Sequence, residues 1–180
     1  QQLFDRLSEE VNHGELLVQR ALGYLAAARR GLSEAEMLGV LFADRDFRRA
    51  IVQKSIENKH RLSRRPKRIP IAIWSRLRSD LAPYLTERSA PGGSVLTLYH
   101  RQVAEWVHAR YVERADWTPH GTDESDKSPH ARLARFFARQ DYFLESLDEQ
   151  RARARKLPPT PRPVNIRKVD ELPSQLLEVG

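Results

Sequence analysis

The chain has 180 residues, of which 40% are hydrophobic and 31% are charged, a composition that supports a folded core and excludes a disordered chain. Cysteine is absent, which excludes disulfides, thiolate zinc sites and thiol nucleophiles. Lys and Arg outnumber Asp and Glu by 31 to 24, a formal net charge of +7, so nucleic acid or an acidic partner has to be considered.

No apolar run approaches the roughly 20 residues that a membrane-spanning helix needs. The first residues, Gln1 to Leu7, do not resemble a signal peptide. The sequence therefore predicts a cytoplasmic protein without membrane association, and the missing initiator Met predicts a fragment of a longer one.

Two strong helical patterns cover residues 15–30 and 33–42, each with apolar side chains at helical spacing. Ser33 and Glu36 have the spacing of a capping box, in which the two side chains satisfy unpaired N–H groups where a helix begins. Leu32 is a candidate one-residue strand beside this cap. A helix, a turn and a second helix are the opening of a helix-turn-helix.

Residues 46–69 are predicted to form a basic insertion. A helix is expected over 46–58, and the cations that follow repel one another, which favours an exposed loop. A solvated loop and a partner surface both remain open for this run. The candidate basic partner surface consists of Arg64, Arg65, Lys67 and Arg68.

Residues 71–81 place Trp74, Leu77 and Leu81 at i, i+3 and i+7, which is typical of a helix packed on one side. This helix would take the third, recognition position of a helix-turn-helix.

Two β-favouring runs follow that helix. Pro83 ends the helix, residues 84–88 and 95–99 favour strands, and residues 90–94 form the turn between them. Two strands and their tip make a wing, so residues 1–113 are predicted to form a winged-helix domain.

Residues 114–129 are polar and rich in turn-forming residues, and are predicted to be an exposed linker. Residues 130–180 are predicted to be a helical extension that leads into a truncated repeat or helical region, with a proline-rich spacer at 157–163. The expected fold class is mainly α with a small β-hairpin, a winged-helix domain followed by C-terminal helices.

His100 falls where the second predicted strand meets a helix that contains Val103, Trp106 and Val107 at helical spacing. The unpaired N–H groups and the positive dipole end of a helix start suit an anion such as phosphate. A lone His at such a junction is more often a cap or a packed polar residue. Local sequence therefore permits a phosphate contact at His100 without demanding one.

Neither a G-x-x-x-x-G-K-[ST] phosphate loop nor a G-x-G-x-x-G loop is present, so the chain alone is expected to bind no nucleotide cofactor. His100 and His108 lie eight residues apart without a third ligand nearby, so no metal site is expected. No strained nucleophile elbow occurs, and no catalytic residue is predicted.

Three blocks of this sequence resemble the winged-helix and adjoining helical region of STAND-type, NACHT-class NTPases, as in the NACHT and WD-repeat, nephrocystin-like and telomerase-associated proteins. The blocks are residues 21–38, residues 74–85 together with 98–102, and residues 130–137 together with 165–177. The resemblance extends from about residue 15 to residue 180. It departs from the family pattern in the long basic segment and in the missing NTPase core.

The resemblance implies a role for the aromatic-x-His segment Leu98-Tyr99-His100. In that family the matching His touches the terminal phosphate of bound ADP and helps to hold a closed, inactive state. The resemblance thus implies a non-catalytic module that senses ADP or ATP in an adjoining nucleotide-binding domain and controls autoinhibition and oligomerisation in signalling. The implied partners are that domain, downstream repeats of the same polypeptide and, in the parent protein, further copies.

The alternative is a nucleic-acid-binding winged helix, in which Arg76, Arg78 and the basic run would contact phosphates. Asp80 and the absence of Asn and Gln from residues 71–81 argue against it, because a recognition helix needs amide side chains to read adenine in a bidentate way. We therefore do not expect nucleic acid as the main partner.

Overall fold

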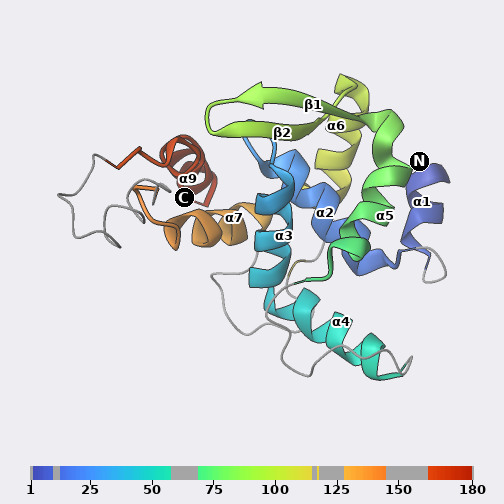
Figure 1. Cartoon of the computed structure of the whole chain (residues 1–180). Helices are drawn as coiled ribbons and strands as arrows, with labels where there is room; N and C mark the ends of the chain where they lie inside the picture. Colours follow the sequence, from blue (N-terminus) through green and yellow to red (C-terminus); the bar gives the residue numbers. More distant parts are fainter. Residues whose placement is uncertain are drawn as a thin grey trace.

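The computed structural model describes residues 2–9, 13–57, 69–114, 117, 128–144 and 162–179. It is mainly helical, with one two-stranded antiparallel hairpin after α5 and further helices toward the C-terminus, as the sequence predicts (Figure 1). In chain order the elements are α1 (Gln2–Ser8), α2 (Glu15–Ala27), α3 (Glu34–Ala43), α4 (Arg45–Glu57), α5 (Ile71–Leu81), a 3₁₀ turn (Ala82–Tyr84), β1 (Leu85–Ala90), β2 (Gly93–Leu98), α6 (Arg101–His108), a π-helical turn (Ala109–Glu113), α7 (Pro129–Ala138) and α9 (Ile166–Val179).

The hairpin is tied to the helices by Leu32, which pairs with Leu96 of β2 as an isolated antiparallel bridge. The Leu32 N–H donates to the Leu96 carbonyl at 3.1 Å, and the Leu96 N–H donates back at 2.8 Å. Gly31 precedes the bridge with φ 84°, and a Cβ there would overlap the Leu96 carbonyl oxygen. The predicted one-residue strand is thus confirmed, and it joins α2, α3, α5 and the hairpin in a winged-helix arrangement.

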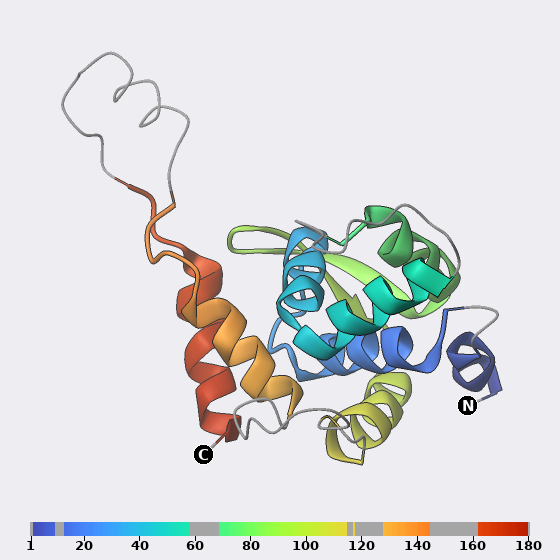
Figure 2. The same cartoon turned by 90° about the horizontal axis from the view of Figure 1, so that it is seen from below.

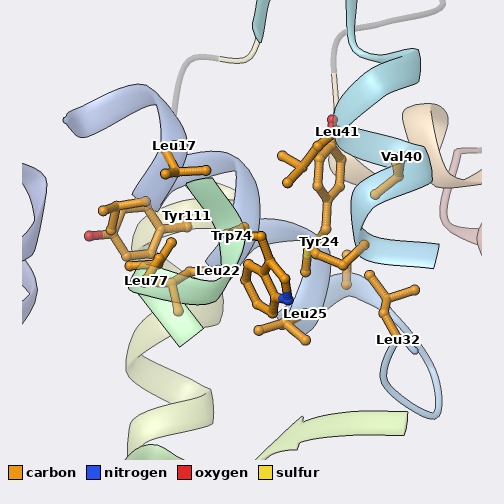
Figure 3. Close-up of a cluster of buried hydrophobic side chains, with 14 of the residues drawn as sticks. Leu17, Leu22, Tyr24, Leu25, Leu32, Val40, Leu41, Trp74, Leu77 and Tyr111 are labelled. Carbon is orange, nitrogen blue, oxygen red and sulfur yellow. The ribbon is translucent and has the colours of Figure 1, made fainter. Parts of the chain in front are cut away.

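Helix α2 runs through the middle of this arrangement and is buried along most of its length (Figures 1 and 2). Trp74 of α5 and Tyr24 of α2 are fully buried, and Figure 3 shows both among the aliphatic side chains of the core. Burying each large apolar side chain contributes about 1.5–3 kcal/mol, which explains why α5 keeps one apolar face inward. The aliphatic residues around them include Leu22, Leu25, Leu32, Val40, Leu41 and Leu77.

Helix α3 begins with the capping box that the sequence predicts. The Ser33 hydroxyl accepts a hydrogen bond from the Glu36 N–H at 3.2 Å, and the Glu36 carboxylate accepts one from the Ser33 N–H at 2.7 Å. Ser128 caps α7 in a similar way, because its hydroxyl accepts from the Ala131 N–H at 3.1 Å. A cap of this kind contributes about 1 kcal/mol.

Trp117 differs from the expectation of an exposed linker over residues 114–129, because it is only 1% exposed. Its indole N–H donates to the Tyr111 carbonyl at 2.9 Å, and its ring lies 5.2 Å from that of Tyr24. Local polarity misled the prediction here, since the indole is buried by residues far away in the chain. Residues 118–127 of the predicted linker lie outside the described residues.

The predicted basic insertion also begins inside the fold. Helix α4 spans Arg45–Glu57, and Phe47 in its first turn is buried. The candidate basic partner surface, Arg64, Arg65, Lys67 and Arg68, lies outside the described residues.

Helices α7 and α9 lie side by side in both views (Figures 1 and 2). Leu133 and Phe137 of α7 belong to the same buried cluster as the core of α2, so the predicted helical extension shares its core with the winged helix. In the part of the chain that the structure describes, no helix is long and apolar enough to span a membrane.

Candidate functional site

His100 occupies the N-cap position of α6, immediately after the hairpin, as the sequence predicts. Its backbone is extended, with φ −93° and ψ 129°, and its carbonyl accepts the first helical hydrogen bond, from Ala104 N–H at 2.9 Å. Its side chain is exposed and makes no capping hydrogen bond. The imidazole is thus neither buried in the core nor used as a cap.

Two contacts orient His100. The ring of Tyr99 stands edge-on to the imidazole, with ring centroids 4.5 Å apart, and the Tyr99 N–H donates to the Tyr84 carbonyl at 2.8 Å. Both rings are exposed, so the aromatic pair presents a surface rather than filling a cavity. The side chain of the neighbouring Arg101 is engaged within α6 and not with His100, because its Nε donates to the Glu105 carboxylate at 2.7 Å.

The helix behind His100 is anchored by aromatic packing. Trp106 stacks on Phe4 of α1 at 4.9 Å, and its ring meets that of Tyr111 edge-on at 6.0 Å. Val107 is fully buried. This anchoring keeps the start of α6 rigid and leaves its first-turn N–H groups beside an exposed imidazole, a combination that suits an anion.

A shallow cleft runs along the side of α6, between the hairpin and the end of α2, with a volume of about 750 Å³. Ala104, Glu105 and His108 line it from α6, whereas His100 is not part of its lining. His108 contacts Glu113 at 3.1 Å. The structure therefore does not bring the two histidines of α6 into one site.

The outer surface of α5 bears on the nucleic-acid alternative. Arg78 forms ion pairs with Glu34 at 3.1 Å and with Glu87 at 3.7 Å, so its charge is neutralised within the fold. Asp80 contacts His13 at 2.8 Å. Arg76 is exposed. One of the two arginines of the alternative is thus engaged with carboxylates rather than presented to phosphates.

A buried polar site among the described residues was not predicted from the sequence. Asp44 lies between α3 and α4. One of its carboxylate oxygens forms ion pairs with Arg20 Nε at 3.1 Å and with Arg132 Nη1 at 2.6 Å. The Tyr24 hydroxyl donates to the same oxygen at 2.7 Å, and the other oxygen accepts from the Phe47 N–H at 3.0 Å, capping α4. We call Arg20, Tyr24, Asp44, Asp46, Trp117 and Arg132 the Asp44 cluster.

The two arginines of the Asp44 cluster meet Trp117. The guanidinium carbon of Arg20 lies 4.2 Å from the centre of the indole, and both arginines donate to the Trp117 carbonyl, at 3.4 Å from Arg20 and 2.6 Å from Arg132. Arg132 also pairs with Asp46 at 3.2 Å. Two buried cations are thus matched by two buried carboxylates, the condition under which burial of charge is tolerated.

Burial within this cluster shifts two pKa values. Desolvation, followed by the nearby Asp44 carboxylate, raises the pKa of the Tyr24 hydroxyl well above its usual value. Desolvation lowers the pKa of Arg20, and the Asp44 charge partly opposes this. Both shifts have the same main cause, the burial of the two groups away from water.

A sequence signal for the cluster exists at Arg20. It is a charged residue on the otherwise apolar inner side of α2, between Leu17 and Tyr24. Such a residue predicts a buried ionic partner, but periodicity does not say which carboxylate supplies it. Among the described residues no group of His, Asp and Glu side chains could hold a metal ion.

Comparison with known proteins agrees with the resemblance that the sequence motifs carry. The chain is 34% identical over 191 aligned residues to human NACHT domain- and WD repeat-containing protein 1, a match that covers 99% of this chain. The mouse protein of the same name is 32% identical over the same share, and human NACHT and WD repeat domain-containing protein 2 is 32% identical over 80% of this chain.

The chain spans only 11% of the length of the first of these relatives and 7% of the second human protein. No family model matches the chain, and no solved structure matches it. Over 99% of its length, the chain is homologous to one segment of the NACHT and WD-repeat proteins.

Proposed function

We propose that this chain is a non-catalytic regulatory module of a STAND-type NTPase. It packs on a nucleotide-binding domain of the same longer polypeptide and responds to ADP or ATP bound there. His100 is the nucleotide-sensing residue. In this role the module stabilises an autoinhibited state and, when released, permits the parent protein to assemble with further copies in signalling.

The observation that supports this proposal best is the exposure of His100 at the start of α6. The imidazole makes no capping bond, Tyr99 orients it, and packed aromatic residues fix the helix behind it. A donor presented in this way can hydrogen-bond to a phosphate oxygen in one nucleotide state and not in another. Such a differential contact is what a ligand needs in order to bias a two-state equilibrium.

The nucleotide belongs to the parent protein in this proposal, not to the chain by itself. The sequence has no phosphate loop, and His100 lies outside the cleft beside α6. The chain of 180 residues should therefore bind ADP and ATP no more tightly than roughly millimolar by calorimetry. Micromolar affinity would identify a complete nucleotide site and contradict the proposal.

His100→Ala in the full-length parent is the direct test. A charge-assisted hydrogen bond is worth about 1.5–3 kcal/mol, so its loss should shift the ratio of closed to open molecules about ten- to a hundredfold. The variant should be purified with less ADP and should assemble without its trigger. Nucleotide content by chromatography and mass by light scattering measure both effects.

His108→Ala is the matched control, since His108 is exposed at the other end of α6 and contacts Glu113 instead. It should keep both ADP and the closed, monomeric state. If His100→Ala also keeps both, the sensing role is wrong, whether or not the 180-residue chain carrying it loses stability.

A further inference from the structure

The two faces of α9 have the reverse of the usual polarity. The residues that it buries are polar or charged, and each of them has partners outside α9. They are Arg167, Lys168, Glu171 and Gln175, all 7% exposed or less. A helix at the edge of a protein normally buries its apolar stripe and exposes its charges.

The buried face is well matched. Arg167 donates to the Glu36 carboxylate at 2.8 and 3.1 Å and to the Gly31 carbonyl at 2.8 Å. Glu171 accepts from the N–H groups of Arg29 and Arg30, at 3.1 and 3.0 Å, just beyond the end of α2. This network fixes the rotation of α9 about its own axis, so the opposite face is held outward.

The outward face is apolar. It consists of Ile166, Val169, Leu176 and Leu177, which are between 48% and 82% exposed. We call these four residues the outer face of α9. The positions 166, 169 and 176 recur at i, i+3 and i+10, and Pro173 fills the i+7 position between them. This is the spacing with which one helix presents a seam to another helix.

Further exposed apolar side chains lie in the two chain segments that meet at the N-terminal end of α9. Phe143 and Val164 form an isolated antiparallel bridge, and the Leu144 N–H donates to the Pro163 carbonyl at 2.8 Å. These segments are ordered by backbone bonds while their side chains stay outside. The exposed members are Tyr142, Phe143, Leu144 and Val164, each 47% to 56% exposed.

Several exposed apolar side chains on one face of a helix are a sign of an interaction site, since single exposed apolar residues are common on protein surfaces but groups of them are not. The charged inner face of α9 supports the same interpretation. If α9 were an edge helix, rotation by half a turn would bury Leu176 and Leu177. The ionic contacts to Glu36 and to the end of α2 prevent this rotation. Helix α9 therefore has the surface chemistry of an inner layer that lacks its outer neighbour.

We propose that the outer face of α9 is the docking surface for an amphipathic helix of the same longer polypeptide. The chain spans only 11% of the relative that it matches over 99% of its own length, so proteins of this kind carry additional polypeptide that can supply such a helix. The occupant has an apolar stripe at helical spacing and lies along α9, and Leu177 is buried in that contact. The proposal rests on α9 and does not depend on the role of His100.

Thiol labelling tests the proposal directly, because the chain contains no cysteine. Leu177→Cys places a single thiol on the outer face of α9, and Ser79→Cys places one at an exposed position of α5 as the control. Each variant is made in the 180-residue chain and in the full-length protein. Alkylation by iodoacetamide is followed by mass spectrometry of the peptide that carries the new cysteine.

In the 180-residue chain both thiols should be alkylated at the rate of a cysteine in an unstructured peptide. In the full-length protein Leu177→Cys should react at least about tenfold more slowly, a factor that corresponds to about 1.4 kcal/mol of protection. Ser79→Cys should react equally fast in both. Leu177 is the most exposed member of the face, so its replacement leaves the fold intact, and Leu176→Cys repeats the measurement one residue away.

Two results would overturn the proposal. Equally fast labelling of Leu177→Cys in the full-length protein would show that no segment covers α9. Protection in the 180-residue chain that grows with protein concentration would show that a second copy of the chain, and not a helix of the longer polypeptide, occupies the face.

Discussion

Helix α2 is held from different directions by two kinds of contact. Toward α6 the contact is apolar: Val107 and Tyr111 are buried in the same cluster as α2, and Trp106 packs against it. Toward α7 and α9 ionic contacts are added to the apolar packing of Leu133 and Phe137, and they are made by the Asp44 cluster and by the bonds of Glu171 to the end of α2.

The two kinds of contact differ in how specifically they fix the arrangement of the helices. Apolar contacts are non-directional and scale with the area removed from water, so α6 can tolerate small changes of volume. A buried ion pair is weak evidence for stability, but losing one partner strands the other in a dry interior. The ionic side should therefore respond far more sharply to single substitutions, and it fixes one arrangement of α7 and α9.

Asp44→Ala should give the largest effect. It leaves Arg20 without its carboxylate partner and Arg132 with Asp46 alone, removes the acceptor of the Tyr24 hydroxyl and uncaps α4. Breaking a buried pair in this way costs about 3–5 kcal/mol of unfolding free energy. Urea denaturation, followed by fluorescence of Trp117 and the other tryptophans, measures it.

Asp5→Ala is the control for the cluster. Asp5 pairs with Arg110 at 2.8 Å, but both side chains are about two-fifths exposed or more, so its loss should cost no more than about 1 kcal/mol. Equal losses for Asp44→Ala and Asp5→Ala would show that the Asp44 cluster is not the ionic anchor inferred from its geometry.

Gly23→Ala tests the point where the two kinds of contact meet. A Cβ on Gly23 would overlap the Trp117 ring and come within 3.0 Å of the Tyr111 carbonyl oxygen. The ring is buried and stacked on Arg20, so it cannot move aside, and we expect a loss of about 1–3 kcal/mol despite the better helix propensity of Ala.

Gly39→Ala is its counterpart in α3. The added Cβ would lie 2.7 Å from the ring of Phe136, which is only partly buried and can turn outward. Its effect on thermal stability should be clearly smaller than that of Gly23→Ala. A larger loss of stability for Gly39→Ala than for Gly23→Ala would mean that the Trp117 ring can move aside more easily than the Phe136 ring.

The smallest expected effect is a decline in the free energy of unfolding at alkaline pH. Burial raises the folded-state pKa of Tyr24 above the value near 10 of an unfolded tyrosine. The unfolded state therefore releases this proton first, so the contribution of Tyr24 is complete below about pH 10 and declines as the pH rises above it. Tyr111, whose pKa is also raised by burial, acts in the same direction.

Tyr24→Phe isolates the contribution of Tyr24. The variant loses the hydrogen bond to Asp44, about 1 kcal/mol, at neutral pH, and its unfolding free energy should fall less steeply above pH 10 than that of the unchanged chain. Parallel declines in the two proteins would assign the alkaline loss to other groups.

Short-range pattern determined most of the architecture. Helical spacing, the Ser33 to Glu36 capping box and the turn residues after Tyr84 predicted the helices and the hairpin, and Leu32 was placed as the strand that joins them. These features depend on residues a few positions apart, which a sequence shows directly. The position of His100 at a helix start followed in the same way, whereas its role as a nucleotide sensor stays a prediction.

Tertiary structure alone decided where the charges are buried. Arg20 meets Trp117 across 97 positions of sequence, and Arg132 meets Asp46 across 86. Polar residues such as Arg132, Arg167 and Glu171 look like a solvated face until their partners are known. Burial of a charge depends on a matched partner from a distant segment, whereas helix formation depends on neighbours. Local pattern in this protein therefore predicted which segments fold, and only the assembled chain showed that α9 turns Arg167, Lys168 and Glu171 inward and Leu176 and Leu177 outward.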